Sequence, residues 1–162
     1  MKEKTLQKLQ RKFLSLPLHH IDTDVIIEPE NAENGRCCTR YMKRAGIKYR
    51  GRLSIPVLGE ILLYTIKELK DKKNQYTMLD LILGFISERK IEFASVDCVE
   101  EIISKIKQID SRIEPMDRLN LACAVADGAD TFVTLDGKLL GNKKLVTELN
   151  IEIKNPSEFP LS

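Results

Sequence analysis

The pattern of apolar and polar positions predicts strands that alternate with helices. Short apolar runs of strand length occupy residues 18–22, 53–55, 91–96, 131–135 and 151–153. Apolar residues recur at helical spacing over 37–45, from Pro56 to about residue 69, and over 76–89, 98–109, 116–126 and 143–149. This alternation favours an α/β fold, and we predict a three-layer α/β/α sandwich around a mostly parallel sheet. In such folds, ligands bind beyond the carboxyl ends of the strands.

The first 16 residues form a segment of their own. An apolar stripe at helical spacing runs along it, its cations lie elsewhere on the helix, and Pro17 ends the pattern. The stripe consists of Leu6, Leu9, Phe13 and Leu16. We therefore predict three parts of the chain: an N-terminal helical arm over 1–16, the main domain over 17–155 and a C-terminal tail over 156–162.

The composition is that of an ordinary globular protein, and it excludes some classes of protein and some kinds of active site. The 162 residues include 26 Lys and Arg against 24 Asp and Glu, a formal net charge of +2, which excludes a uniformly basic, histone-like protein. Four cysteines without a C-x-x-C pair, and only two histidines, argue against zinc sites and histidine-based triads. No apolar run approaches the ~20 residues of a membrane span, and no secretory signal is evident. We expect a cytoplasmic protein that binds no membrane and whose chemistry rests on carboxylates.

Four acids stand at predicted strand ends or at the helix starts beside them: Asp22, Glu60, Asp117 and Asp136. Three of them have a local explanation too. Asp117 suits the first turn of a helix, Asp136 suits a turn before Gly137, and Glu60 can reach the rim of its helix. Asp22 is the least easily explained in this way, because apolar residues flank it and burial of a lone carboxylate is costly. Together, the four oxygen donors fit a hard cation such as Mg²⁺ or Mn²⁺.

Four segments resemble the PIN-domain nucleases, a family that includes the toxin ribonucleases of VapBC toxin–antitoxin operons. The segments are residues 21–25, 54–61, 115–124 and 132–136, and the resemblance extends over roughly 18–153. It implies a small α/β/α sandwich in which the four acids form a catalytic site for Mg²⁺ or Mn²⁺, with Thr134 in support. It also implies an RNA substrate, and an antitoxin protein and a second copy of the chain as partners.

The chain departs from the family pattern at two positions. Asp24 stands where the family usually has Asn, and it either supports the site with a further carboxylate or caps the following turn. Lys138 stands where the family often has another acid. Since a cation lowers the negative charge available to a second ion, this departure favours one metal ion or weak binding over two ions.

A basic stretch lies between the first two acids. Residues 34–59 contain no Asp or Glu but seven Lys and Arg, a polarisation that favours phosphate binding. The seven are Arg36, Arg40, Lys43, Arg44, Lys48, Arg50 and Arg52. Tyr41 and Tyr49 offer stacking surfaces for bases. We predict a nucleic-acid-binding strip; the alternative is a solvated helix face that contacts nothing.

Three functions fit these patterns. The first is a metal-dependent endoribonuclease that hydrolyses RNA phosphodiester bonds through the four acids, as a toxin or otherwise. The second starts from the motif Asp22-Thr23-Asp24-Val25, which is also similar to the nucleophile motif of haloacid-dehalogenase phosphohydrolases. That class needs a downstream Lys and a later acidic pair, which the sequence does not convincingly supply. The third is a non-catalytic module of the same fold that binds RNA or protein.

Overall fold

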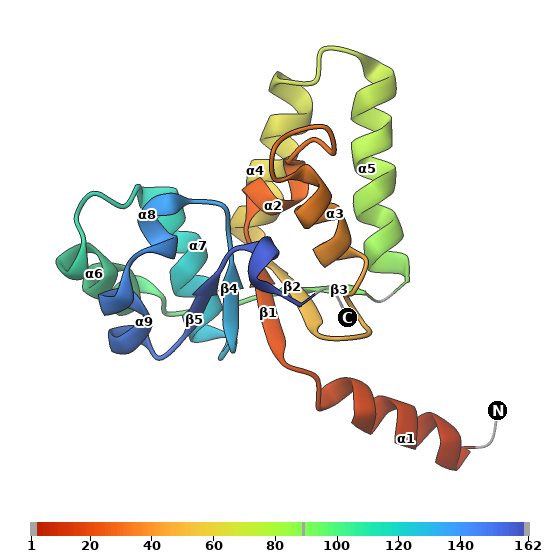
Figure 1. The fold of residues 1–162 in the computed structure, drawn as a ribbon, viewed down its shortest axis with the longest axis horizontal. Coiled ribbons are helices and arrows are strands. Elements are labelled where there is room, and N and C mark those ends of the chain that lie inside the picture. The colour runs from red at the N-terminus through yellow and green to blue at the C-terminus, as the bar shows by residue number, and fades with distance from the viewer. Residues whose placement is uncertain (1–2, 89, 161–162) are drawn as a thin grey trace.

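Five parallel strands form the centre of the molecule. In the computed structural model, which describes residues 3–88 and 90–160, they are β1 (Leu18–Ile21), β2 (Arg50–Ser54), β3 (Ile91–Ala94), β4 (Thr131–Val133) and β5 (Glu152–Lys154). Their order across the sheet is β3-β2-β1-β4-β5, and all four neighbouring pairs are parallel (Figure 1). The predicted α/β fold around a parallel sheet is confirmed.

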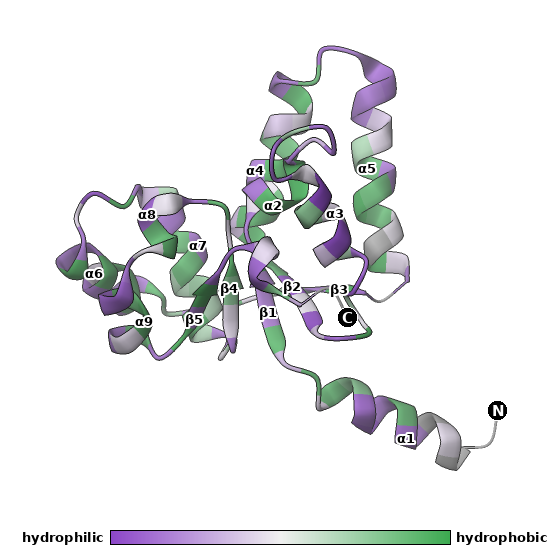
Figure 2. Cartoon of the chain, viewed as in Figure 1, coloured by the Kyte–Doolittle hydropathy of each residue, from purple (hydrophilic) through white to green (hydrophobic). Residues whose placement is uncertain are grey.

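Helices cover both faces of this sheet. One layer contains α2 (Thr23–Ile27), α3 (Gly35–Met42), α4 (Ile55–Lys67) and α5 (Lys72–Ser87). The other contains α6 (Glu100–Ile109), α7 (Pro115–Ala126), α8 (Gly137–Leu140) and α9 (Lys143–Leu149). Each layer has its own apolar core, one around Ile61 of α4 and the other around Leu121 of α7. Figure 2 shows apolar segments on helices of both layers, as a three-layer sandwich requires.

The strand order reverses between β1 and β4. The connections through β2 to β3 place their helices on one face, and those from β3 through β4 to β5 place theirs on the other. At such a switch point, the two connections diverge and leave a crevice beyond the carboxyl ends of the strands. Asp22 follows β1 and Thr134 follows β4, so polar side chains lie where this crevice opens.

Two short helices, α2 and α8, are absent from the sequence prediction. Each has five residues or fewer, too short to show a helical repeat, and each is started by an acid that accepts a backbone hydrogen bond, Asp22 from Thr23 and Asp136 from Lys138. The helix predicted over about 37–45 is present as α3, but its bounds differ, since α3 runs from Gly35 to Met42. α3 ends at Met42, because the chain turns there, and Gly46 then takes a left-handed φ of 77°.

The two ends of the chain behave differently. The predicted N-terminal helix is present as α1 (Glu3–Leu14), which projects away from the sandwich (Figure 1). The C-terminal segment instead packs back through the 3-10 helix η1 (Pro156–Glu158) and Phe159, whose ring centroid lies 5.2 Å from that of His19. None of the helices within 3–88 and 90–160 is long and apolar enough to cross a membrane.

Candidate functional site

All four predicted acids lie toward the carboxyl edge of the sheet. Asp22 follows β1 and caps α2, and Asp136 follows β4 and caps α8. Glu60 lies in the second turn of α4, which starts directly after β2, and Asp117 lies in the first turn of α7. Four segments that are distant in the sequence therefore bring their carboxylates to the switch point.

Shared donors join Asp22 and Glu60. The side-chain amide nitrogen of Asn120 donates to Asp22 Oδ1 at 3.2 Å and to Glu60 Oε2 at 2.7 Å. Thr23 makes a second link, because its hydroxyl donates to Glu60 Oε2 at 2.7 Å and its backbone N–H donates to Asp22 Oδ1 at 2.9 Å. An amide nitrogen has two hydrogens, and Asn120 uses one on each acid. It therefore holds the two carboxylates side by side.

Thr134 makes a similar link on the other side of Asp22. Its hydroxyl oxygen lies 2.8 Å from Asp22 Oδ2 and 3.2 Å from Asp24 Oδ2, and the backbone N–H of Asp136 donates to it at 3.0 Å. The backbone N–H of Leu135 donates to Asp24 Oδ2 at 2.9 Å. A hydroxyl has a single hydrogen and can serve only one carboxylate at a time. Thr134 and Asp24 thus lie beside Asp22, and their supporting roles remain predictions.

Burial and nearby negative charges favour the protonated form of Asp22, Asp24 and Asp117. Asp22 is only 4% exposed, and this burial raises its pKa, with the charge of Asp24 as the next cause. Burial also raises the pKa of Asp24. Burial, followed by the charges of Asp22 and Asp136, raises the pKa of Asp117 to about 6. Within the described chain, no Lys, Arg or His forms an ion pair with any of these acids.

The chemistry of the donors fits a divalent cation, although the side chains do not yet surround one. Among the described residues, no three His, Cys, Asp or Glu side chains lie close enough to hold a metal ion as they stand. However, Oδ1 of Asp24 and Oδ1 of Asn120 are buried and have no hydrogen-bond partner in the part of the chain that the structure describes. Oxygen donors of this kind suit Mg²⁺ and Mn²⁺, and a cation would offset the repulsion among the acids. The residues therefore fit such an ion, provided that their side chains close around it.

Asp22 is not placed like the nucleophile of a phosphohydrolase. Its two oxygens accept hydrogen bonds from Thr23, Asn120 and Thr134, and the side chain is buried. Lys138, the cation nearest in sequence to Asp136, has its Nζ 3.3 Å from Glu114. Nothing in this arrangement favours the haloacid-dehalogenase alternative.

The seven predicted cations do not form one strip. α3 carries Arg36 and Arg40, and Lys43 and Arg44 follow it, all on the face covered by α2 to α5. Lys48 and Arg50 lie at the amino edge of the sheet, since β2 begins at Arg50 and its carboxyl end is about 13 Å further along the strand. The backbone N–H of Lys48 donates to Arg44 O at 2.9 Å, so Arg44 also lies near this edge. Side chains alternate between the two faces along a strand, so Arg50 and Arg52 point toward the face covered by α6 to α9 and away from α3.

Arg52 belongs to a different network. Its Nη1 lies 2.7 Å from Asp127 Oδ1, its Nε lies 3.2 Å from Glu92, and Asp127 also contacts His20 Nε2 at 2.7 Å. Two carboxylates already hold this guanidinium, so we remove Arg52 from the predicted nucleic-acid contacts. Arg36, Arg40 and Lys43 are exposed on or beside α3, and these three remain predicted nucleic-acid contacts.

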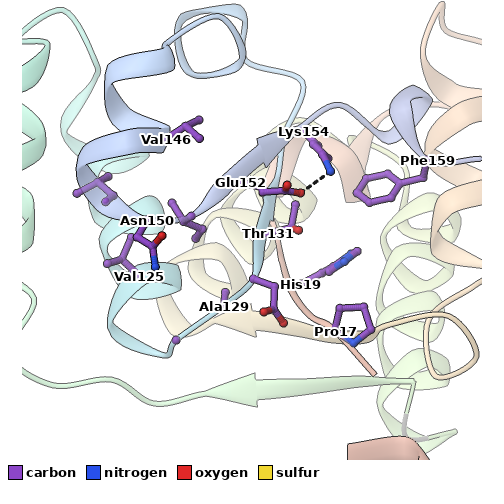
Figure 3. A pocket seen from close by; sticks show the side chains of 14 residues that line it. Pro17, His19, Val125, Ala129, Thr131, Val146, Asn150, Glu152, Lys154 and Phe159 are labelled. Atoms are coloured by element: carbon purple, nitrogen blue, oxygen red, sulfur yellow. Dashed lines mark ion pairs between the residues drawn. The ribbon is translucent and has the colours of Figure 1, made fainter. Parts of the chain in front are cut away.

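The predicted base-stacking role of Tyr41 and Tyr49 is wrong. Both rings are 2% exposed, and they stack on each other with centroids 4.6 Å apart. His19 stacks on Tyr49 at 4.5 Å and also lines a hollow of about 820 Å³ over β1, β4 and β5 (Figure 3). That hollow contains none of the four acids.

Sequence reasoning missed Asn120 and Thr23. Asn120 is 1% exposed in a helix of small apolar residues, and it stands three residues after Asp117, on the same side of the helix. A polar residue at that spacing from a candidate acid was the available signal. Thr23 directly follows Asp22 and gave no comparable signal, because its link to Glu60 depends on the tertiary fold.

Comparison with solved structures supports the fold. The chain is similar to one in the structure of VapBC2 from Rickettsia felis bound to a DNA fragment from their promoter (19% identity, TM-score 0.64, 85% of this chain and 98% of the other). It is also similar to chains in FitAcB from Neisseria gonorrhoeae (19%, 0.64, 87% and 99%) and in FitAB bound to an IR36 DNA fragment (22%, 0.63, 88% and 97%). No family model and no curated protein sequence matches. At these identities the likeness establishes the α/β fold.

Proposed function

We propose that this protein is a ribonuclease that hydrolyses RNA phosphodiester bonds with the help of Mg²⁺ or Mn²⁺. The observation that carries the proposal is the convergence of Asp22 and Glu60, from different elements, on one side-chain amide at the switch point. Asp117 and Asp136 border the same place. The likeness to VapBC and FitAB structures, together with the resemblance of the four motif segments, favours nuclease chemistry over other uses of this fold.

The four acids would hold the ion, which would activate a water molecule and stabilise the negative charge that develops on the phosphate. Asn120 and Thr23 position the carboxylates of Asp22 and Glu60, since each donates one hydrogen bond to either acid. The hydroxyl of Thr134 lies between Asp22 and Asp24 and donates to one of them at a time. Asp24 adds a further buried carboxylate beside Asp22.

We further propose that the chain is the toxin of a toxin–antitoxin pair and acts in the cytoplasm. The structures it resembles are named for paired proteins, VapBC2 and FitAB, and two of them contain DNA. The expected partners are RNA, a small antitoxin protein and a second copy of this chain. Co-purification with the product of a neighbouring reading frame would test the antitoxin.

Cleavage of labelled RNA in the presence of Mn²⁺ tests the proposed activity. Wild-type protein should cut the RNA, chelation of the metal should stop cleavage, and Asp22→Asn should be inactive. The matched control is Asp80→Asn, because Asp80 is an exposed acid on α5 far from β1 in the sequence and its loss should change nothing. Equal cleavage by wild type and Asp22→Asn would point to a contaminant. RNA binding without any turnover would favour the non-catalytic module.

A further inference from the structure

A second basic surface lies beside the acids, outside the stretch that the sequence singled out. It lines a hollow of about 670 Å³ formed by the end of α6, by α8 and by the start of α9. The side chains that give this hollow its charge are Asp110, Arg112, Lys138, Lys143 and Lys144. Four cations against one acid make it positive overall.

Two of these cations have partners and two do not. Arg112 is held by Asp110 through Nε and Nη2, at 2.9 and 2.8 Å, and Lys138 lies 3.3 Å from Glu114. The ion pairs found in the described chain include neither Lys143 nor Lys144, and both side chains are exposed. The positive charge of the hollow is therefore available to a ligand mainly through these two lysines.

The hollow begins next to the candidate site. Gly137 and Lys138 line it, and the backbone N–H of Lys138 donates to Asp136 Oδ1 at 2.6 Å. Gly137 and Gly141 present no side chain there, so a ligand can approach the backbone between Asp136 and Lys143. The hollow therefore borders Asp136, one of the four acids.

The position of the hollow complements that of α3. β4 leads into α8 at the carboxyl edge of the sheet, and α9 begins there, in the layer that contains α6 and α7. The cations of α3 lie in the opposite layer. In Figure 1, α8 and α3 lie on opposite sides of the strands β1 and β4. The acids therefore stand between two cationic surfaces.

We propose that this hollow, through Lys143 and Lys144, binds phosphates of the RNA strand on the side of the four acids opposite α3. The proposal rests on the proposed ribonuclease function and adds a path for its substrate. A phosphate-binding surface without exposed aromatic side chains recognises charge and not sequence, so its contribution should be the same for RNAs of different sequence. It should also weaken as the salt concentration rises.

The test compares two lysine pairs that stand at identical helical positions. Lys143 and Lys144 are the first two residues of α9, and Lys72 and Lys73 are the first two of α5. All four are exposed, so Lys→Gln changes remove the same charge from the same helical position and should affect folding alike. The α5 pair lies in the other helix layer and serves as the control.

RNA binding is measured by fluorescence anisotropy with labelled single-stranded RNA of mixed sequence, in the Asp22→Asn background so that no cleavage interferes. Lys143→Gln/Lys144→Gln should lower the affinity on the order of tenfold near 0.1 M salt and reduce the slope of log K against log salt by about 1.4. Lys72→Gln/Lys73→Gln should change neither quantity. Thermal unfolding checks that both double variants remain folded.

Two results would overturn the proposal. One is a Lys143→Gln/Lys144→Gln protein that binds RNA as tightly as its parent and with the same salt slope. The other is a loss of affinity that appears for duplex DNA but not for single-stranded RNA. The ribonuclease proposal fails separately: if the wild type never cleaves RNA but the lysine pair still governs RNA binding, the binding surface stands and the nuclease does not.

Discussion

Two regions of the molecule hold buried or half-buried acidic side chains, and they differ in whether a cation pairs with the carboxylates. Between α7 and the sheet, Asp127 meets His20 and the guanidinium of Arg52, so a carboxylate is compensated by a cation. At the switch point, the donors that Asp22 and Glu60 meet among the described residues are neutral, such as the amide of Asn120. In the first region, the negative charge of Asp127 is compensated by the positive charge of Arg52. In the second, no cation of residues 3–88 and 90–160 forms an ion pair with the acids.

This difference separates a structural network from a candidate binding site. Neutral donors satisfy hydrogen bonds, but they cannot remove the repulsion among several carboxylates. Burial, and after it the charges of Asp22 and Asp136, raises the pKa of Asp117 to about 6. Perturbed carboxyls that gather in a crevice are typical of functional sites. By contrast, the Asp127 network has its counter-charge in place and needs no ligand. We expect substitutions in the two regions to affect different properties.

The largest expected difference is in activity. Glu60→Gln keeps the shape of the side chain but removes a charge from the proposed site, so kcat for RNA cleavage should fall on the order of 10²–10³-fold. Asp127→Ala should leave kcat within a few-fold at a temperature where the protein is folded. Single-turnover kinetics with a labelled RNA measure both. Comparable losses for the two variants would remove the distinction between the regions.

The next effect is stabilisation by metal. An ion that binds the folded protein alone raises the free energy of unfolding by about 2.7 kcal/mol at a concentration of 100 times its Kd. Mn²⁺ should therefore raise the melting temperature of the wild type and of Asp127→Ala, but not that of Asp22→Asn. Calorimetry at increasing Mn²⁺ concentration measures this. A similar rise in Asp22→Asn would place the ion elsewhere.

Loss of the compensated network should instead lower stability. Asp127→Ala leaves Arg52 with Glu92 as its one carboxylate partner in the described chain and removes the contact of His20. Because the Arg52 side chain is 26% exposed, water replaces part of what is lost, and the free energy of unfolding should fall by about 2 kcal/mol. Urea unfolding without metal provides the measurement. A loss below about 0.5 kcal/mol would show that the network is not important for stability.

The smallest expected effect is a pH-dependent gain in the free energy of unfolding when Asp117, at the uncompensated site, is replaced by Asn. The pKa of Asp117 is raised from 3.8 to about 6 in the folded protein, so between these values the folded state keeps a proton that the unfolded state loses. Stability therefore falls as pH rises through this window, and the cost is complete above it. Asp117→Asn removes that cost. Since Asp117 is partly exposed, we expect a gain of about 1–2 kcal/mol above pH 7 and none below pH 4 without metal.

Urea unfolding of Asp117→Asn and wild type across this pH range checks the sign. A variant that is less stable than wild type at neutral pH would show that Asp117 has a compensating partner. Saturating Mn²⁺ should reverse the order of the two proteins, because only the wild type keeps all four acids for the ion.

The sequence predicted the four acids because each follows a local rule. Asp22 and Asp136 end apolar strands, and the carboxyl ends of parallel strands share one edge of a sheet. The same reasoning placed Thr134 close to them. The roles of these residues in catalysis remain predictions, since geometry alone does not test them.

The errors concern residues whose partners lie far along the chain. Arg52 stands in a basic stretch but pairs with Asp127, which is 75 residues away, and charge counting cannot detect such a pair. Tyr41 and Tyr49 face a core completed by Phe159, near the C-terminal end. Asn120 was missed because an isolated amide in an apolar helix gains meaning only when the acids it contacts are in view.

A crystal structure of the protein soaked with Mn²⁺ would show whether the four acids hold a metal ion, with the metal located from its anomalous scattering. We expect a peak among Asp22, Glu60, Asp117 and Asp136, with carboxylate oxygens of at least two of these residues as ligands. A fully loaded crystal with no peak there, or with Mn²⁺ bound only at other surface acids, would contradict it.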